Sequence, residues 1–300
     1  MEHFQKIELR KTRNFSEKLN VTFEFIRQNF KGFIPAILYI SVPLYIIGKI
    51  IISYYQNFIF PKSVAEPDMT SFLGGMFGVF LPAYLFIGLG YLFNASLVYN
   101  YVSLYGERDD PRTITINEIS DYAKKDIGNI FVAGLLVGIV ASLGFLLLII
   151  PGIYLGVTLS LITSVIILER KSVGDAFSRC FALIKEKWWS TFGLLFIAAL
   201  IQGSMGAIFT IPEMVFTFIV TFHRETYDIT ATPPLWQQAG VILSSCLSAI
   251  GAGLLSCITY LALAFQYFNL VERKEASGLM AKLDSFGSQH DKQEDSREHY

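Results

Sequence analysis

Long apolar stretches alternate with shorter polar segments along this chain, and the pattern predicts an all-α membrane protein. A helix needs about 20 mainly apolar residues to cross the hydrocarbon core of a bilayer. The predicted transmembrane helices are 33–53, 72–99, 129–149, 151–168, 192–210 and 240–268. They divide the chain into a cytoplasmic amphipathic segment (1–32), a six-helix transmembrane domain (33–271) and a disordered cytoplasmic tail (272–300).

Two short sequences mark breaks in the apolar pattern. Ile150-Pro151-Gly152 separates the third and fourth predicted helices, and proline cannot donate a backbone hydrogen bond. We therefore predict a tight turn there and an antiparallel hairpin. The stretch 211–222 is apolar but exceeds the length that the fifth helix needs. With Pro212 at its start, we interpret it as an interfacial or re-entrant piece on the outer side.

The distribution of positive charge predicts the orientation. Of the 24 Lys and Arg residues, only Lys62 and Arg224 fall in loops on one side, and Lys49 lies inside the first predicted helix. All others fall on the opposite side, which the positive-inside rule assigns to the cytoplasm. We expect both termini inside the cell. Trp188 and Trp189 open the fifth helix and fit an aromatic anchor at the interface.

A threefold repeat is predicted from the polar segments. Each one that precedes an odd-numbered helix opens with a capping pattern: Asn14 with Glu17, Thr115 with Glu118, and Ser172 with Asp175. Each even-numbered helix leaves with an acid–base pair: Glu107-Arg108, Glu169-Arg170 and Glu272-Arg273. The alternative is that every cytoplasmic loop needs basic residues, but this does not explain the caps. The predicted fold is three transmembrane hairpins, each preceded by a cytoplasmic amphipathic interfacial helix.

Composition supports the membrane assignment. The chain is 53% hydrophobic and 16% charged, whereas soluble domains carry about 25% charged residues. Polar residues within predicted membrane helices are candidate functional positions. Lys49 can instead reach the headgroups, and Glu213 can lie in solvent at the outer interface. Asn94, Gln202 and Gln266 can line a polar pocket or join helices by hydrogen bonds, the role we favour.

No catalytic or metal-binding pattern is recognisable. The four histidines, His3, His223, His290 and His299, are scattered and form no metal-binding helix motif. A nucleophile elbow and a phosphate-binding glycine-rich loop are also absent from the sequence. We predict no catalytic residue, no cofactor, no metal and no nucleic-acid partner.

Several hydrophobic motifs carry a family resemblance. They are Pro151-Gly152-Ile153-Tyr154-Leu155-Gly156-Val157, Leu168-Glu169, Ser172-Val173, Ala176-Phe177, Trp188-Trp189 and Phe192-Gly193. Residues 115–200 thereby resemble the membrane domain of glycerophosphoryl diester phosphodiesterases. Residues 24–31 resemble stand-alone six-helix members of Bacteroidetes-type bacteria. The resemblance implies a bacterial inner-membrane protein. Its phosphodiesterase-linked members carry their catalytic His and Glu in a soluble barrel, so no catalytic residue can be transferred to this chain.

Three functions compete on this basis. The first is a non-enzymatic membrane module that binds membrane lipids, a membrane-protein partner or a second copy of itself. The alternative is a small-molecule or lipid transporter or channel that uses the polar residues inside the membrane. An intramembrane enzyme ranks last, because it needs converging acid–base or metal groups.

Overall fold

The structure of the chain is a computed structural model that describes residues 6–59, 69–226 and 233–276. Regular structure throughout these ranges is helical, as predicted: α1 (Phe15–Ala36), η1 (Ile37–Ser41), α2 (Val42–Tyr54), η2 (Tyr55–Ile59), α4 (Met69–Gly75), η3 (Met76–Phe80), α5 (Leu81–Glu107), η4 (Pro111–Thr113), α6 (Ile116–Leu147), α7 (Ile149–Leu159), α8 (Ile162–Leu168), α9 (Val173–Ile184), α10 (Trp188–Thr226) and α11 (Leu235–Glu275).

Six helical stretches are long and apolar enough to cross a membrane: Phe15–Ile59, Leu73–Glu107, Ile116–Leu147, Ile149–Leu168, Trp188–Phe222 and Leu235–Glu275. The last one extends past the predicted domain boundary at residue 271. Most of the predicted disordered tail (277–300) lies outside the described residues.

All three predicted N-caps are present, but only one of them forms the complete capping box that the sequence pattern predicts. The side chains of Asn14, Thr115 and Ser172 each accept a hydrogen bond from the backbone N–H three residues later. At Asn14 the backbone N–H also donates to the Glu17 carboxylate, and this reciprocal bond completes a capping box. These bonds satisfy N–H groups that have no partner within the helix, and they fix the start of α1, α6 and α9.

The segments after the caps turn equivalent positions inward. The residues four positions after each cap are Lys18, Ile119 and Ala176, and those eight positions after it are Thr22, Ala123 and Cys180. All six are buried. The caps and these buried positions therefore recur at equal spacing in the three segments, whereas the repeat of whole hairpins stays a prediction.

The described helices differ from the predicted ones in continuity. Helix α1 passes without a break through η1, α2 and η2, and α6 is one uninterrupted helix. Of the three segments after the caps, only α9 is separate from the helix that follows. Pro35 lies inside α1, and the π-helical η1 follows it. The chain stays helical through this irregularity, although proline removes one backbone hydrogen bond.

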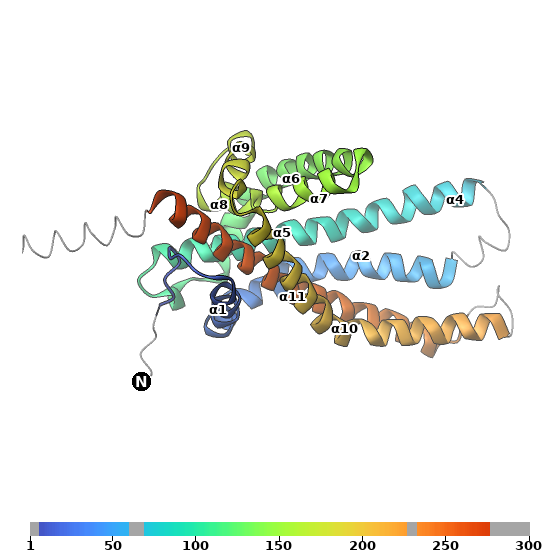
Figure 1. Cartoon of the computed structure of the whole chain (residues 1–300). Helices are drawn as coiled ribbons and strands as arrows, with labels where there is room; N and C mark the ends of the chain where they lie inside the picture. Colours follow the sequence, from blue (N-terminus) through green and yellow to red (C-terminus); the bar gives the residue numbers. More distant parts are fainter. Residues whose placement is uncertain (1–5, 60–68, 227–232, 277–300) are drawn as a thin grey trace, which may run out of the picture.

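Of the two predicted breaks, the first lies at a different residue and the second is absent. The turn between α6 and α7 lies at Leu148, which has an extended backbone, and Pro151 falls in the first turn of α7, where its missing N–H costs nothing. Pro212 lies inside α10, which Figure 1 shows bent along its length but continuous, so 211–222 belongs to the fifth helix and is not a separate piece. The Thr210 hydroxyl bonds the carbonyls of Gly206 and Ala207 just before the proline.

Helix α11 is the centre of the bundle. It packs along α10 and against α1, α2 and α5. Aromatic side chains fill the core where α1, α5 and α11 meet: Phe25 lies 4.8 Å from Tyr105 and 5.7 Å from Phe265 between ring centroids. These large side chains are fully buried, and they join segments that are distant in sequence.

The tip of the α6–α7 hairpin does not extend as far along the bundle as the neighbouring helices do. Figure 1 shows α2, α4 and α10 continuing well beyond the end of α6 and α7. From Ser142 to Ile150 every residue except Gly144 is exposed, so among the described residues the tip of the hairpin packs mainly on itself. The hairpin also does not pack extensively against α11.

Candidate functional site

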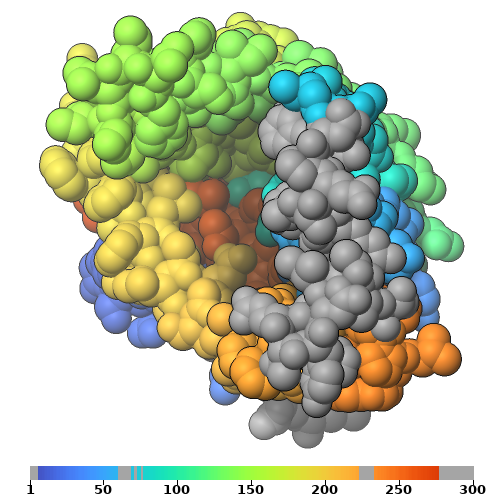
Figure 2. Space-filling model, turned by 90° about the vertical axis from the view of Figure 1, so that its right-hand side faces the viewer, coloured from blue at the N-terminus to red at the C-terminus, as the bar shows by residue number. Residues whose placement is uncertain are grey.

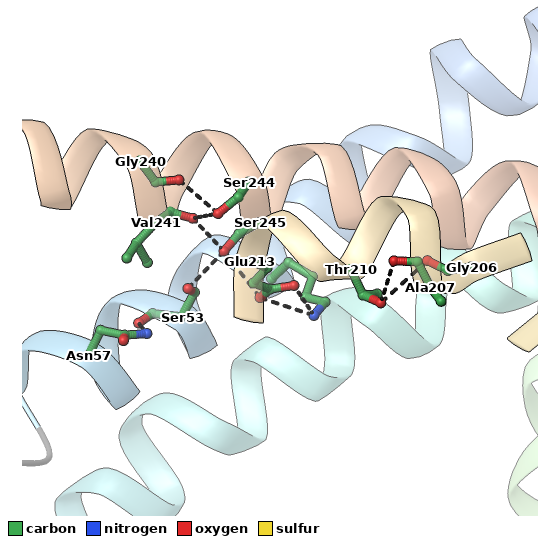
Figure 3. A network of polar contacts seen from close by, with 11 residues as sticks. Ser53, Asn57, Gly206, Ala207, Thr210, Glu213, Gly240, Val241, Ser244 and Ser245 are labelled. Carbon is green, nitrogen blue, oxygen red and sulfur yellow. Dashed lines mark hydrogen bonds and ion pairs between the residues drawn. The ribbon is translucent and has the colours of Figure 1, made fainter. Parts of the chain in front are cut away.

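A polar cluster joins α2, α10 and α11 inside the bundle (Figure 3). The Lys49 Nζ lies 3.0 Å from Glu213 Oε2 and 3.2 Å from Oε1. The Ser245 hydroxyl lies 3.2 Å from the same carboxylate and 2.7 Å from the Ser53 hydroxyl. The sequence analysis treated Lys49 and Glu213 as two separate charges. In the structure they form an ion pair. The cluster pairs the lysine with a carboxylate and ties three helices together.

Asn94 lies at the next contact between α5 and α11. Its amide donates to the Gly253 carbonyl at 2.7 Å and to the Ser256 hydroxyl at 2.9 Å. Tyr45 of α2 packs closely on Gly90 and Gly253, where a Cβ would meet its ring at 3.1 and 3.2 Å. The Asn94 Oδ1 and the Tyr45 hydroxyl are buried without a hydrogen bond in the described structure.

The two candidate glutamines also lie between helices. Gln202 of α10 accepts a 2.7 Å bond from Thr259 of α11. Gln266 of α11 accepts a 2.6 Å bond from Lys18 and donates a 2.8 Å bond to Thr191. The structure therefore does not bring the four candidates together in one cavity. Each has its own partner on another helix, and this pairing fits the favoured role of joining helices.

A charged cluster connects α8 and α9 to the C-terminal part of α11. The Arg179 Nε lies 3.0 and 3.1 Å from the Glu169 carboxylate oxygens, and Tyr267 donates to the same carboxylate at 2.9 Å. Lys171 is 3.2 Å away. Burial raises the pKa of Glu169, but hydrogen bonds from Arg179, Tyr267 and Lys171 outweigh it and leave that pKa below its usual value.

A second charged cluster lies beside the first and holds α6 to the end of α8. Arg170 has a left-handed backbone with φ 52°, and its guanidinium contacts Asp126 at 3.0 and 3.1 Å. Asn100 of α5 donates to Asp126 at 2.8 Å and accepts from Arg170 at 3.2 Å. These bonds offset the cost of an unusual conformation for an arginine.

An aromatic pocket lies between α7 and the start of α10. Its lining residues are Ile150, Ile153, Tyr154, Lys185, Glu186, Trp188, Trp189 and Phe192, and its volume is about 570 Å³. Pockets for small ligands span about 300 to 1,000 Å³. The sequence indicated Trp188 and Trp189 only as membrane anchors, because the approach of residue 150 to residue 185 is a tertiary contact. We call this the hairpin pocket.

The hairpin pocket lies where two walls of a larger hollow approach each other. Figure 2 shows this hollow between the α6–α7 hairpin (green) and α10 (yellow), with α11 visible in its floor. It exists because the hairpin packs on α5, α8 and α9 but not extensively on α11. The helices around the hollow are apolar, so an apolar group that entered it would gain dispersion contacts.

Metal-binding clusters of three or more His, Cys, Asp or Glu are absent from the described residues. The three cysteines are unpaired. Burial, and then the negative charge of Glu169, raise the pKa of the Cys180 thiol to about 12, so it stays protonated and serves as a small core side chain.

Comparison with known proteins gives one result. Residues 123–270 match the family model of a domain of unknown function, DUF7847. The matched part begins in α6 and ends in α11, so it includes the hairpin pocket, Glu213 and Gln266 but neither Lys49 nor Asn94. This part of the chain is similar to that domain. The chain matches no curated protein and no solved structure.

Proposed function

We propose that this chain is a multi-pass, non-enzymatic protein of the bacterial cytoplasmic membrane that binds lipid, with both termini inside the cell. In this proposal its helices form three hairpins with amphipathic cytoplasmic segments, related to the membrane domain of glycerophosphoryl diester phosphodiesterases. The lopsided distribution of Lys and Arg supports the orientation. A reporter fused after Glu107 or at the C-terminus should be found inside the cell.

The hollow in Figure 2 carries the lipid-binding proposal. Its walls are apolar helices, and the hairpin beside it ends in exposed leucine and isoleucine side chains. Flexible acyl chains fill such an irregular space more readily than a rigid helix does. The polar side chains of the bundle meanwhile bond to one another between helices, so they support a packing role rather than a chemical one.

The test is lipid retention. The protein is extracted in polymer nanodiscs, transferred to mild detergent and weighed by native mass spectrometry. We expect bound lipid to survive the transfer. Replacing Ile150 and Ile153 of the hairpin pocket with Asn should remove it, whereas the matched change of Leu146 and Leu147 at the same hairpin tip should not. A lipid-free monomer, or a lipid-free dimer held by the same residues, would contradict lipid binding.

A transporter or channel is the second candidate, and the cluster of Lys49 with Glu213 favours it. Charged residues within membrane helices commonly mark ion or substrate pathways. If the chain transports a solute, proteoliposomes should show flux that Glu213→Gln abolishes. Retained lipid together with unchanged flux in this variant would leave the cluster a structural role.

A further inference from the structure

The hairpin pocket has an unpaired basic rim. Lys185, Glu186 and Lys187 form the short link between α9 and α10, and all three are exposed. Lys185 and Glu186 line the pocket itself. The arginines of the neighbouring clusters pair with carboxylates, but no described residue forms an ion pair or a side-chain hydrogen bond with either lysine. Lys185 and Glu186 therefore bring one ammonium group and one carboxylate to the rim. Lys187 does not line the pocket, but it follows them in the link and gives this exposed link a net positive charge.

The wall of the pocket is aromatic and rigid. The Trp188 ring lies nearly parallel to the rings of Tyr154 and Phe192, at centroid distances of 5.8 and 5.4 Å and interplanar angles of 17° and 7°. Its indole N–H donates to the Tyr154 carbonyl at 3.2 Å, which fixes the ring and satisfies its one polar group. Trp189 stands perpendicular to it and is 77% exposed. This apolar surface is preformed and does not have to be ordered when a ligand binds.

An apolar wall with positive charge at one end matches an amphiphile with an anionic head. We propose that the hairpin pocket binds an anionic glycerophospholipid. One acyl chain lies along Trp188 and the hairpin isoleucines, and the phosphate lies at Lys185 and Lys187. Long lysine stems can cover apolar surface while the ammonium groups reach the headgroup. The proposal rests on lipid binding as proposed above and adds the headgroup class and the binding residues.

Tryptophan fluorescence tests this directly. Trp236 lies at the start of α11, near the opposite end of the molecule, so Trp236→Phe leaves only the two pocket tryptophans. This variant is placed in nanodiscs that contain dibrominated phosphatidylglycerol or dibrominated phosphatidylcholine at equal mole fractions. Bromine quenches indole on contact. We expect an apparent affinity about fivefold higher for the anionic lipid, as one net charge near a membrane surface contributes about this much.

Charge variants separate this proposal from general lipid binding. Lys185→Gln with Lys187→Gln should abolish the preference while both lipids still quench, and Glu186→Gln should increase it. A protein with Trp188 and Trp189 replaced by Phe, and Trp236 retained, is the control and should show no preference. If both lipids quench the Trp236→Phe variant equally while its lysines are unchanged, the preference for an anionic headgroup is wrong, whereas lipid binding still holds. Quenching that falls as protein is added at constant lipid would show that a second copy covers the pocket, which also overturns the proposal.

Discussion

Lys49 and Glu213 are 164 residues apart in sequence and 3.0 Å apart in space. The sequence indicates that each residue is unusual, but it contains nothing that pairs them, because the pairing depends on how α2 and α10 pack. The same holds for Asn94, Gln202 and Gln266. Candidate positions could be predicted at the residue scale, whereas their partners could not.

Removing one member of the Lys49–Glu213 pair should destabilise the bundle. Glu213→Gln leaves a lysine without its counter-charge among apolar helices. Breaking a fully buried pair costs about 3 to 5 kcal/mol, and an exposed one about 0.2 to 1 kcal/mol. With side-chain exposures of 32% and 17%, we expect a loss of about 1 to 3 kcal/mol in detergent-based unfolding.

The control is a double-mutant cycle. Lys49→Met with Glu213→Gln removes both charges and should recover part of the loss. Strictly additive effects of the two single changes would mean that the pair contributes no coupling energy.

Glu169 should make the packing of α9 sensitive to acid. Its pKa is lowered in the folded protein, so its stabilising contribution is complete above the pKa of the unfolded chain, about 4.3, and is lost as pH falls through the folded value. We expect the thermal midpoint of the wild type to fall more steeply below this pH than that of Glu169→Gln. If the thermal midpoints of the two proteins fall in parallel as the pH is lowered, ionisation of Glu169 does not contribute to the pH dependence of stability.

At the scale of the element, the α6–α7 hairpin depends on two glycines. A Cβ on Gly144 would lie 3.0 Å from the Gly152 Cα and 3.1 Å from its nitrogen, both backbone atoms. A Cβ on Gly152 would lie 2.5 Å from the Phe145 ring. Small residues allow the two helices this close approach. The hairpin was predictable from sequence, but its contact residues and its turn at Leu148 were not, because Pro151 fits the first helical turn as well as a loop.

Gly144→Ala should therefore destabilise the hairpin, since the backbone of α7 must move away. Overpacking of this kind typically costs about 1 to 3 kcal/mol. Gly138→Ala is a matched control in the same helix, because no atom lies within 4 Å of its Cβ position. We expect a lowered thermal midpoint in detergent for Gly144→Ala alone. Equal effects of the two changes would indicate that loss of glycine, rather than the close contact, is responsible.

Helix starts were the most predictable elements. The caps at Asn14, Thr115 and Ser172 depend on residues within one turn, so local sequence determines them. Helix continuity depends on surroundings as well. Pro35 and Pro212 both lie inside helical stretches that continue past them, with a π-helical turn after the first and a bend in the helix that contains the second.

At the scale of the whole molecule, apolar length predicted six membrane-spanning candidates but not their relative reach. Periodicity and composition indicate the length of a helix. They do not indicate the offset of that helix along the bundle axis relative to the helices beside it. The hollow in Figure 2 and the hairpin pocket result from that offset, so both were invisible in the sequence.

The short hairpin predicts a protected tip. In the proposed orientation Leu148→Cys should resist a membrane-impermeant maleimide from either side of the membrane. Trp236 is 58% exposed near the far ends of the long helices, so Trp236→Cys should react from outside. Labelling of Leu148→Cys from outside, at a rate like that of Trp236→Cys, would show that the hairpin crosses fully.

The limited reach of α6 and α7 also gives the protein an uneven cross-section. In the proposed orientation the hairpin, α8 and α9 add area on the cytoplasmic side, while among the described helices α2, α4, α10 and α11 continue toward the outer side (Figure 1). A body that displaces more area from one monolayer than from the other is wedge-shaped. Its elastic energy then depends on curvature, and the protein should collect where the membrane bulges toward the cytoplasm.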